Sequence, residues 1–411
     1  MAERQTLKVP SLLEGKRIFK GDKPLAMIFL CLIVCSILVF YSATPKMGYG
    51  AQAITRAHSH LLSHLMSISL GFTTALIAYL LPFKFVNRCS RGMFYFFLVL
   101  TLITPLIGVT INGATRWISV FGFSLQPSEF LRISTIVYTA YLLSRYRDYV
   151  ERWSILVFFR WLQKKNVNKQ KEATDILKHG LWQISIVFFA ILIILLEHTS
   201  SAVLLGLSIF IMLLVGGISR SEVRRLLLIG ACLIALMMVF HNIGRSKTAK
   251  GRVKDWIELW TKGYDKSKPV YEFADAELSM VAIYNGGLYG NGAGQSVMRA
   301  KMTHPESDYI FGIFFEEYGL MLAIPLILTY LWIFARCFII AARSKWVYKQ
   351  LCVTGLGFMM VAQAMIHFMV AVNLLPETGQ TLPLISHGGS SIICYSFAIG
   401  YILNASKQQE L

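Results

Sequence analysis

Long apolar runs alternate with short polar and basic segments along this chain of 411 residues. An α-helix needs about 20 mostly apolar residues to cross the hydrocarbon core of a membrane, and ten of the runs approach or exceed that length. They cover residues 25–43, 60–82, 93–110, 127–144, 181–197, 201–217, 226–242, 309–335, 350–372 and 388–404. The pattern predicts an all-α polytopic integral membrane protein of about ten transmembrane helices, with a large extracytoplasmic loop, 243–308, between spans 7 and 8.

Clusters of Lys and Arg fall at every second connection between these runs. They lie in the N-terminal segment and within 84–91, 145–178, 220–225 and 336–349. Cytoplasmic loops carry this excess, so both termini are expected in the cytoplasm and the loop 243–308 outside. We therefore expect residues 1–24 to be a cytoplasmic segment, 25–404 the membrane domain and 405–411 a cytoplasmic tail. The first run is too long for the apolar part of a secretory leader and is interpreted as an uncleaved span.

Composition excludes several classes of protein. A chain with 55% hydrophobic and 15% charged residues, and a mean hydropathy of +0.56, is not an ordinary soluble domain. The net charge of +18 would suit nucleic acid, but most of the 40 Lys and Arg fall in segments predicted to be cytoplasmic. The enrichment of Lys and Arg in cytoplasmic loops of membrane proteins explains the positive charge, so no nucleic-acid partner is expected. The seven cysteines form no CxxC pair and avoid the long polar loop, which excludes disulfide and zinc frameworks.

Two further patterns look like ligand sites but are weak. His60 and His64 share a helix face, with His58 nearby, yet no carboxylate lies close in sequence to complete a metal site. The glycine-rich segment 285–294 has neither the spacing nor the preceding strand of a phosphate-binding loop. It predicts a flexible turn at the membrane surface.

Asp308 is the first strong candidate for chemistry. It stands where the long basic loop meets the apolar run that begins at Ile310. A carboxylate at such a boundary is partly desolvated yet reachable from water, which suits a general base. The alternative is that Asp308 only caps the coming helix, because anions are favoured at helix N-termini.

Two other outside loops carry polar residues at membrane depth. Pro127 fits the first position of a helix, so Glu129 and Arg132 would share one face as an ion pair or face a polar cavity. The segment 375–391 contains two prolines and three glycines between apolar residues, which indicates a re-entrant loop buried against protein. In that loop His387 is either a satisfied polar residue or a reacting group.

Three segments together resemble the signature motifs of the SEDS family. They read GATRWISVFGFSLQPSEFLR (113–132), GGLYGNGAGQSVMR with HPESDYIFGIFFEEYGL (286–320) and LPETGQTLPLISHGGSS (375–391), in the family's order. Family members polymerise lipid II, the undecaprenyl-pyrophosphate-linked disaccharide-peptide, into glycan strands at the outer face of the cytoplasmic membrane. The resemblance places Asp308 at the family's essential aspartate, and Arg116, Trp117 and Glu129 at its cavity residues.

The resemblance implies a single inverting displacement, from an α-linked pyrophosphate to a β-1,4 bond. Asp308 is then the base for the acceptor hydroxyl, and cations stabilise the departing pyrophosphate. Our candidates for that second role are Arg116, Arg132 and Lys301, with a divalent cation such as Mg²⁺ or Mn²⁺ and no organic cofactor. We also expect Ser386 and His387 to contact the substrate.

Two positions depart from the family. Arg132 stands where the family usually has Lys, and Glu197-His198-Thr199-Ser200-Ser201 replaces its usual Pro-Asp-Leu-Gly-Thr turn, so the role of that turn is open. The residues of this turn and of the 375–391 loop resemble the division branch of the family more than its elongation branch. That branch implies an inner-membrane protein at the septum, surrounded by membrane lipid, with a class B penicillin-binding protein transpeptidase and other division proteins as partners. A lipid II flippase and an inactive scaffold are the alternatives, but polar residues at the outer ends of the spans favour an enzyme.

Overall fold

The predicted spans all form helices. The computed structural model describes residues 20–43, 51–111, 114–120, 123–147, 174, 182–239, 246–263, 269 and 273–407. Within these ranges the spans are α1 (Lys23–Ala43), α2 (Ala51–Leu80), α3 (Phe83–Ile107), α4 (Pro127–Arg145), α8 (Trp182–Glu197), α9 (Thr199–Val215), α10 (Arg220–Val239), α13 (Ile310–Arg343), α14 (Val347–Ala371) and α15 (Gly389–Ser406). The prediction of an all-α polytopic membrane fold is confirmed.

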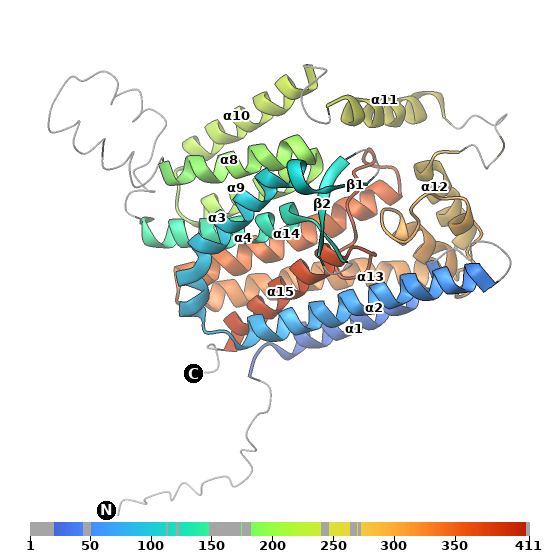
Figure 1. The fold of residues 1–411 in the computed structure, drawn as a ribbon, viewed down its shortest axis with the longest axis horizontal. Helices are drawn as coiled ribbons and strands as arrows, with labels where there is room; N and C mark the ends of the chain where they lie inside the picture. The colour runs from blue at the N-terminus through green and yellow to red at the C-terminus, as the bar shows by residue number, and fades with distance from the viewer. Residues whose placement is uncertain are drawn as a thin grey trace, which may run out of the picture.

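The long helices run roughly along one axis, and the two ends of the described chain lie at the same end of the bundle (Figure 1). The backbone N–H of Asp22 donates to Ser406 Oγ over 2.8 Å, and Asp22 also forms an ion pair with Arg336. A chain that crosses the membrane an even number of times has both of its ends on the same side, as these contacts show. The predicted boundaries at residues 24 and 404 stay predictions, since residues 1–19 and 408–411 lie outside the described part of the chain.

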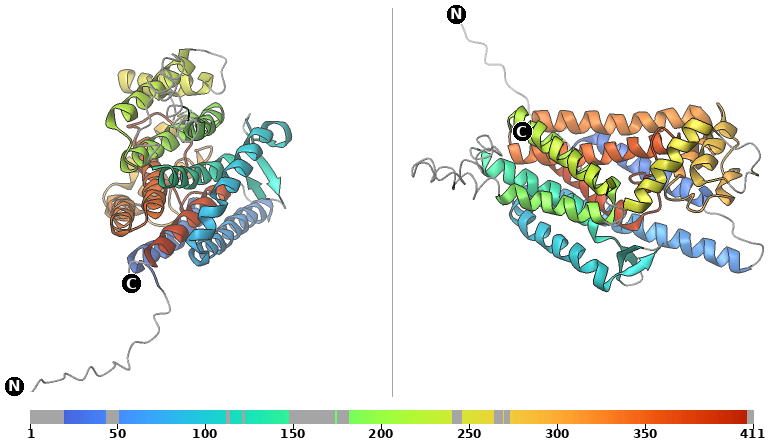
Figure 2. Two further views of the ribbon diagram at one scale, coloured as in Figure 1. Left: turned by 90° about the vertical axis from the view of Figure 1, so that its left-hand side faces the viewer. Right: turned by 90° about the horizontal axis from the view of Figure 1, so that it is seen from above.

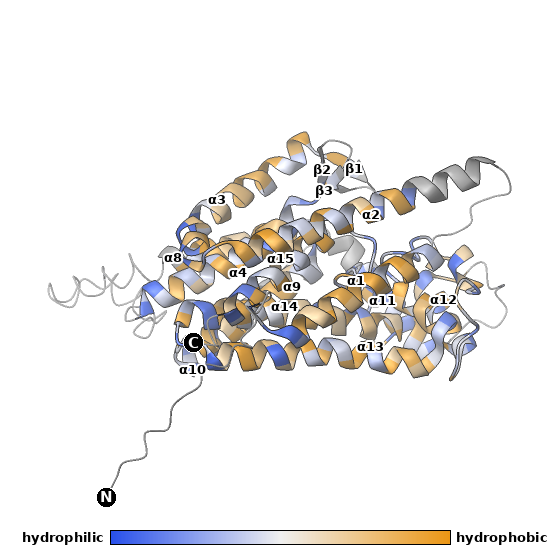
Figure 3. Cartoon of the chain, turned by 90° about the horizontal axis from the view of Figure 1, so that it is seen from below, coloured by the Kyte–Doolittle hydropathy of each residue, from blue (hydrophilic) through white to orange (hydrophobic). Residues whose placement is uncertain are grey.

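The bundle has an apolar exterior and a central helix. Among the described residues, five helical stretches are long and apolar enough to cross a membrane: Lys23–Ala43, His60–Leu80, Phe83–Ile107, Ile310–Arg343 and Val347–Ala371. Hydrophobic residues cover the helices and hydrophilic ones gather mainly toward the ends (Figure 3). In α14, 72% of the apolar window is buried, against 28–44% in the other four, so α14 lies at the centre. It packs on α13, α9, α4 and α15, and α15 packs closely on α2.

The helices α8 and α9 form a short hairpin. With 16 residues, α8 is roughly 24 Å long, less than the roughly 30 Å of a bilayer core. The helices pack against each other, and the turn that joins them at His198 lines a cavity of the protein. The polar residues of this turn therefore face protein and cavity, as polar groups between membrane helices must.

The loops contain secondary structure that the apolar pattern did not predict. Between α3 and α4 lies a small antiparallel sheet of order β1-β2-β3, with β1 (Val109–Ile111), β2 (Ala114–Val120) and β3 (Phe123–Leu125). It stands with α3 at the edge of the bundle (Figure 2). The large loop carries α11 (Ser246–Lys262), α12 (Asp275–Gly286) and the short 3₁₀ helix η3 (Met298–Ala300). β-Branched and aromatic residues such as Thr115, Trp117 and Ile118 favour the sheet.

The glycine-rich segment forms a turn that is hydrogen-bonded to α13, and the prediction that it is flexible stays a prediction. Backbone N–H groups of Asn291 and Gly292 donate to the carbonyls of Glu316 and Glu317, each over 2.9 Å. A Cβ on Gly290 would lie 2.2 Å from the carbonyl oxygen of Glu317, and its φ is +78°, so only glycine fits this close approach. The turn therefore fastens the large loop to α13 just after the segment that carries Asp308.

Candidate active site

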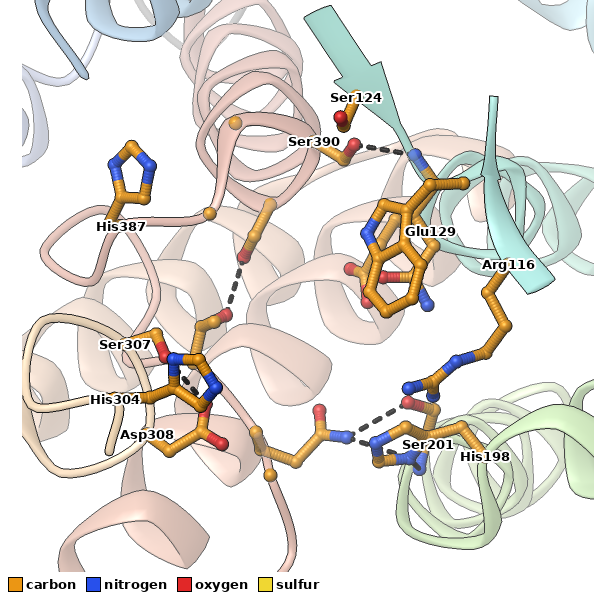
Figure 4. Close-up of a pocket in the computed structure, with 18 of the residues that line it drawn as sticks. Arg116, Ser124, Glu129, His198, Ser201, His304, Ser307, Asp308, His387 and Ser390 are labelled. Atoms are coloured by element: carbon orange, nitrogen blue, oxygen red, sulfur yellow. Dashed lines mark hydrogen bonds between the residues drawn. The ribbon is translucent and has the colours of Figure 1, made fainter. Parts of the chain in front are cut away.

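A cavity of about 500 Å³ gathers residues from seven parts of the chain. Its walls come from β2, β3 and the start of α4, the α8–α9 turn, α11, the start of α12, the segment before α13, the loop 372–388 and the start of α15. Five of the predicted site residues line it: Arg116, Trp117, Glu129, Asp308 and His387. Figure 4 shows Asp308 and His304 on one side of the cavity, with Arg116 and Glu129 on the other.

Asp308 is half-buried and does not act as a helix cap. The N-cap of α13 is Tyr309, which makes no side-chain capping bond, whereas Asp308 Oδ1 accepts a hydrogen bond from Ser307 Oγ over 2.9 Å. Burial raises the pKa of Asp308 above its ordinary value, and the Ser307 hydrogen bond and the nearby His304 and Arg252 oppose this shift without reversing it. The geometry therefore favours the general-base interpretation over the capping one.

Arg116 and Trp117 project from β2 at the far side. The Arg116 guanidinium carbon lies 4.9 Å from the centre of the Trp117 ring, within the range of a cation–π contact. Arg116 also interacts electrostatically with Glu197 at the end of α8. A short antiparallel strand holds the two side chains over the cavity more rigidly than a free loop would.

Arg132 lies behind the cavity wall and is not among the residues that line it. Its side chain is 1% exposed and forms an ion pair with Glu129, which is 13% exposed. Arg132 Nη1 also donates to Gln363 Oε1 over 3.1 Å, and Gln363 Nε2 donates to the carbonyl of Thr381 over 2.8 Å. Arg132 thus links α4 to α14 and, through Gln363, to the re-entrant loop.

Two other predicted residues lie outside the lining. Lys301 is exposed at the end of η3. Ser386 is buried, donates to the carbonyl of Ser307 over 2.7 Å and accepts from the backbone N–H of Leu382 over 2.7 Å. Ser386 therefore holds the re-entrant loop against the residue that precedes Asp308.

The sequence did not single out several residues that line the cavity. Arg252, on α11, lies 3.6 Å from Glu377 of the re-entrant loop. Burial raises the pKa of Glu377, and Arg252 opposes the shift. A Cβ placed on Gly379 would lie 3.6 Å from Arg252 Nη1, 3.7 Å from Asp308 Oδ2 and 3.8 Å from His198 Nε2. These three groups therefore meet around one point of the cavity.

The atypical 197–201 turn also faces the cavity. His198 and Ser201 both line it, and Gln380 Nε2 donates to Ser201 Oγ over 2.9 Å. The Nδ1 atom of His198 accepts from the backbone N–H of Ser201 and so caps α9. The only sequence signal for this role was the departure from the family pattern itself.

Metal ligands are not clustered in this site. The described residues hold no group of three His, Cys, Asp or Glu side chains placed to bind one ion. Both ring nitrogens of His64 are in hydrogen bonds, one with Ser36 and one with His387, so neither is left to bind a metal together with His60. The His58 side chain lies outside the described part of the chain. Within the described ranges no protein cage surrounds a divalent cation, and the Mg²⁺ or Mn²⁺ expected from the sequence stays a prediction.

Comparison with known proteins identifies the family. The model of the FtsW/RodA/SpoVE cell cycle proteins matches residues 23–411. A probable peptidoglycan glycosyltransferase FtsW from Coxiella burnetii is 27% identical over 392 residues, covering 94% of this chain and 96% of that protein. The stage V sporulation protein E of Bacillus subtilis is 30% identical over 315 residues, covering 76% of each chain.

Solved structures share the fold. One is a peptidoglycan synthase complex described as coordinating polymerization and crosslinking, with a TM-score of 0.68 at 18% identity, covering 95% of this chain and 98% of that one. The crystal structure of the rod shape determining protein RodA from Thermus thermophilus gives a TM-score of 0.63 at 18% identity, covering 98% and 100%. Both therefore share the overall fold of this chain. This multi-pass membrane protein therefore belongs to the FtsW/RodA/SpoVE family, the SEDS family that its sequence motifs resemble.

Proposed function

We propose that this protein is a peptidoglycan glycosyltransferase that polymerises lipid II into β-1,4-linked glycan strands. The observation that carries the proposal is the half-buried Asp308 carboxylate, which shares a polar cavity with the nearby Arg252 and with Arg116 on the far side. Relatives of nearly full length are named probable peptidoglycan glycosyltransferases. A base and two cations in one cavity are what glycosyl transfer from a pyrophosphate requires.

Each group has a role in this reaction. Asp308 takes the proton from the acceptor 4-hydroxyl as its oxygen bonds to the anomeric carbon of the donor. The bond from that carbon to the pyrophosphate oxygen breaks, and the pyrophosphate leaves with the electron pair. Arg116 and Arg252 stabilise its charge. Because pyrophosphate is a good leaving group, no general acid is needed, and one displacement inverts the α-linkage to β.

We propose the division branch of the family, with the elongation branch as the alternative. Relatives named FtsW support it, although solved structures with the same fold include RodA. Depleting the protein from its own cells tests the assignment. Filaments with unsealed septa are expected, whereas round cells that still divide would assign the protein to elongation.

The proposed setting is the cytoplasmic membrane, with both termini inside and the cavity opening outward. We further propose that a class B penicillin-binding protein binds alongside. One structural neighbour is a peptidoglycan synthase complex, and a transpeptidase must receive the glycan on the same membrane face. Co-purification in mild detergent tests this partner. Full activity of the isolated protein, with no transpeptidase recovered, would leave the chain acting alone.

The experiment that tests the function is Asp308→Asn in purified protein supplied with lipid II. Asn keeps the size of the side chain but accepts no proton near neutral pH, so polymerisation should be lost while the protein still folds. Glu306→Gln is the matched control, because it makes the same acid-to-amide change two residues away and its side chain does not line the cavity. Near-normal glycan synthesis by Asp308→Asn would remove the base from the mechanism. Wild-type protein that binds lipid II without polymerising it, alone or with a transpeptidase, would favour a transporter.

A further inference from the structure

His387 is part of a chain of three side chains that leads away from the cavity. His387 lines the cavity (Figure 4), and its Nδ1 lies 3.2 Å from Nδ1 of His64 on α2. His64 Nε2 lies 3.0 Å from Ser36 Oγ on α1. The Ser36 hydroxyl in turn donates to the carbonyl of Ile385, also over 3.0 Å.

The hydrogen-bond pattern fixes which nitrogen carries each proton. A hydroxyl has one proton, and Ser36 gives it to the Ile385 carbonyl, which can only accept. The bond between Ser36 and His64 therefore needs a proton on His64 Nε2. In neutral His64 the other nitrogen, Nδ1, then carries a lone pair, so His387 must donate from its own Nδ1.

We propose that His64 and Ser36 hold His387 as the neutral Nδ1–H tautomer, so that its Nε2 accepts a hydrogen bond from a hydroxyl or amide N–H of the substrate's sugar. His387 is then a substrate-binding residue and His64 a positioning residue that acts through it. The inference rests on the proposed function, because that function supplies a sugar for the cavity.

The surroundings of His387 suit a fixed acceptor. The Phe40 ring stacks on both imidazoles, with ring centres 4.1 Å from His64 and 4.9 Å from His387. The backbone N–H of His387 donates to the carbonyl of Glu306 over 2.9 Å, which ties it to the segment of Asp308. Burial, followed by nearby His60, lowers the pKa of His387 to about 4, which keeps its ring neutral near pH 7.

Paired amide substitutions test which nitrogen matters. In Gln the terminal amide group takes the place of the imidazole Nε2, whereas in Asn it takes the place of Nδ1. His387→Gln should therefore keep most lipid II polymerisation, while His387→Asn should raise KM or lower kcat by about tenfold, the effect of one hydrogen bond to substrate. Equal activity of both variants, or the reverse order, would overturn the substrate contact.

The positioning role has a spectroscopic readout. Nitrogen-15 NMR of histidine-labelled protein in bilayers, with the His387 signals assigned by their loss in His387→Gln, should show protonated Nδ1 and bare Nε2. His64→Leu should change the tautomer of His387, whereas the exposed His60→Asn, on the same helix, should leave its Nδ1 protonated and its Nε2 bare. Protonated Nε2 on His387 in the wild type would overturn the assignment. If the wild-type protein fails to polymerise lipid II, the proposed function and the substrate contact fail while the tautomer result stands.

Discussion

Arg132 is the residue for which sequence and structure lead to different expectations. The sequence made it a candidate for binding the substrate pyrophosphate, but its side chain is 1% exposed and faces Glu129. Replacement with Met keeps much of the length of the side chain and removes the charge. If Arg132 supports the wall of the cavity, Arg132→Met should act on stability first and on turnover only through the fraction of folded protein.

The loss of stability in Arg132→Met depends on which interactions Gln363 and Glu129 keep once the guanidinium is gone. Gln363 Oε1 still accepts from the Tyr395 hydroxyl over 2.5 Å, so that acceptor stays satisfied. Glu129 loses its cation while 13% exposed, and an uncompensated buried charge costs about 3–5 kcal/mol. Adding Glu129→Gln removes that charge, so the double variant should recover most of the loss. Arg132→Lys should be intermediate, because an ammonium group cannot bridge Glu129 and Gln363 with two arms.

Titration with SDS in mixed micelles measures the free energy of unfolding of each variant, and lipid II turnover is then expressed per folded molecule. We expect a loss of about 3–5 kcal/mol for Arg132→Met with turnover per folded molecule largely retained. An unfolding free energy within about 0.5 kcal/mol of wild type, together with strongly reduced turnover, would refute this reasoning. Arg132 would then contact the pyrophosphate directly.

Other changes separate the groups of the cavity. Arg116→Ala should lower turnover about 10- to 150-fold with little change in unfolding, since one charge-assisted contact contributes about 1.5–3 kcal/mol; unchanged turnover would remove Arg116 from substrate binding. Gly379→Ala should lose activity, because its methyl group would lie among Arg252, Asp308 and His198 at a φ of +62°, whereas Gly263→Ala has a similar φ of +71° and meets nothing within 4 Å; equal effects would reduce this to backbone strain. Burial raises the pKa of Asp308, so ionising it costs the folded state stability at neutral pH. Asp308→Asn should thus unfold at higher SDS than wild type at pH 7, and the difference should vanish below the ordinary aspartate pKa of about 3.9; a less stable variant at pH 7 would contradict this. Lys262→Cys, 71% exposed on α11, should react with an impermeant maleimide in intact spheroplasts; labelling only after permeabilisation would invert the topology.

The spans were predictable because the bilayer acts on the sequence directly. A lipid-exposed helix must be apolar where it crosses the bilayer, so hydropathy alone locates both ends of α1, the end of α3 and the start of α13 to within one turn. It misses the start of α3 and the end of α13, where the helices continue into more polar sequence. The loops obey no such rule. The strand β2 alternates too briefly to stand out, and α11 is charged enough to read as a solvated surface. Their structure depends on tertiary packing, which a hydropathy pattern does not encode.

A site residue could be predicted where its own position in the sequence is unusual, and not where its role depends on contacts with distant parts of the chain. Asp308 stood out because a carboxylate at the edge of an apolar run is costly without a purpose. Arg252 did not, because long outer loops are exempt from the charge bias and may carry Lys and Arg freely. Only folding shows that α11 brings Arg252 to Glu377, at 3.6 Å, from 125 positions earlier in the chain. Arg132 is the opposite case. It belongs to one of the motifs, yet its side chain lies behind the cavity wall, so a place in a motif does not by itself put a side chain in the site.

The re-entrant loop explains why so many polar residues lie inside this bundle. Irregular backbone at membrane depth must have its carbonyls satisfied by protein. Tyr330 donates to Pro383, His367 to Gln380 over 2.8 Å and Gln363 to Thr381 over 2.8 Å. These side chains come from α13 and α14, the helices that pack behind the loop. The hydrogen bonds that satisfy the carbonyls of this loop therefore also hold Gly379, Gln380 and His387 around Asp308. The same contacts stabilise the loop and preorganise the site.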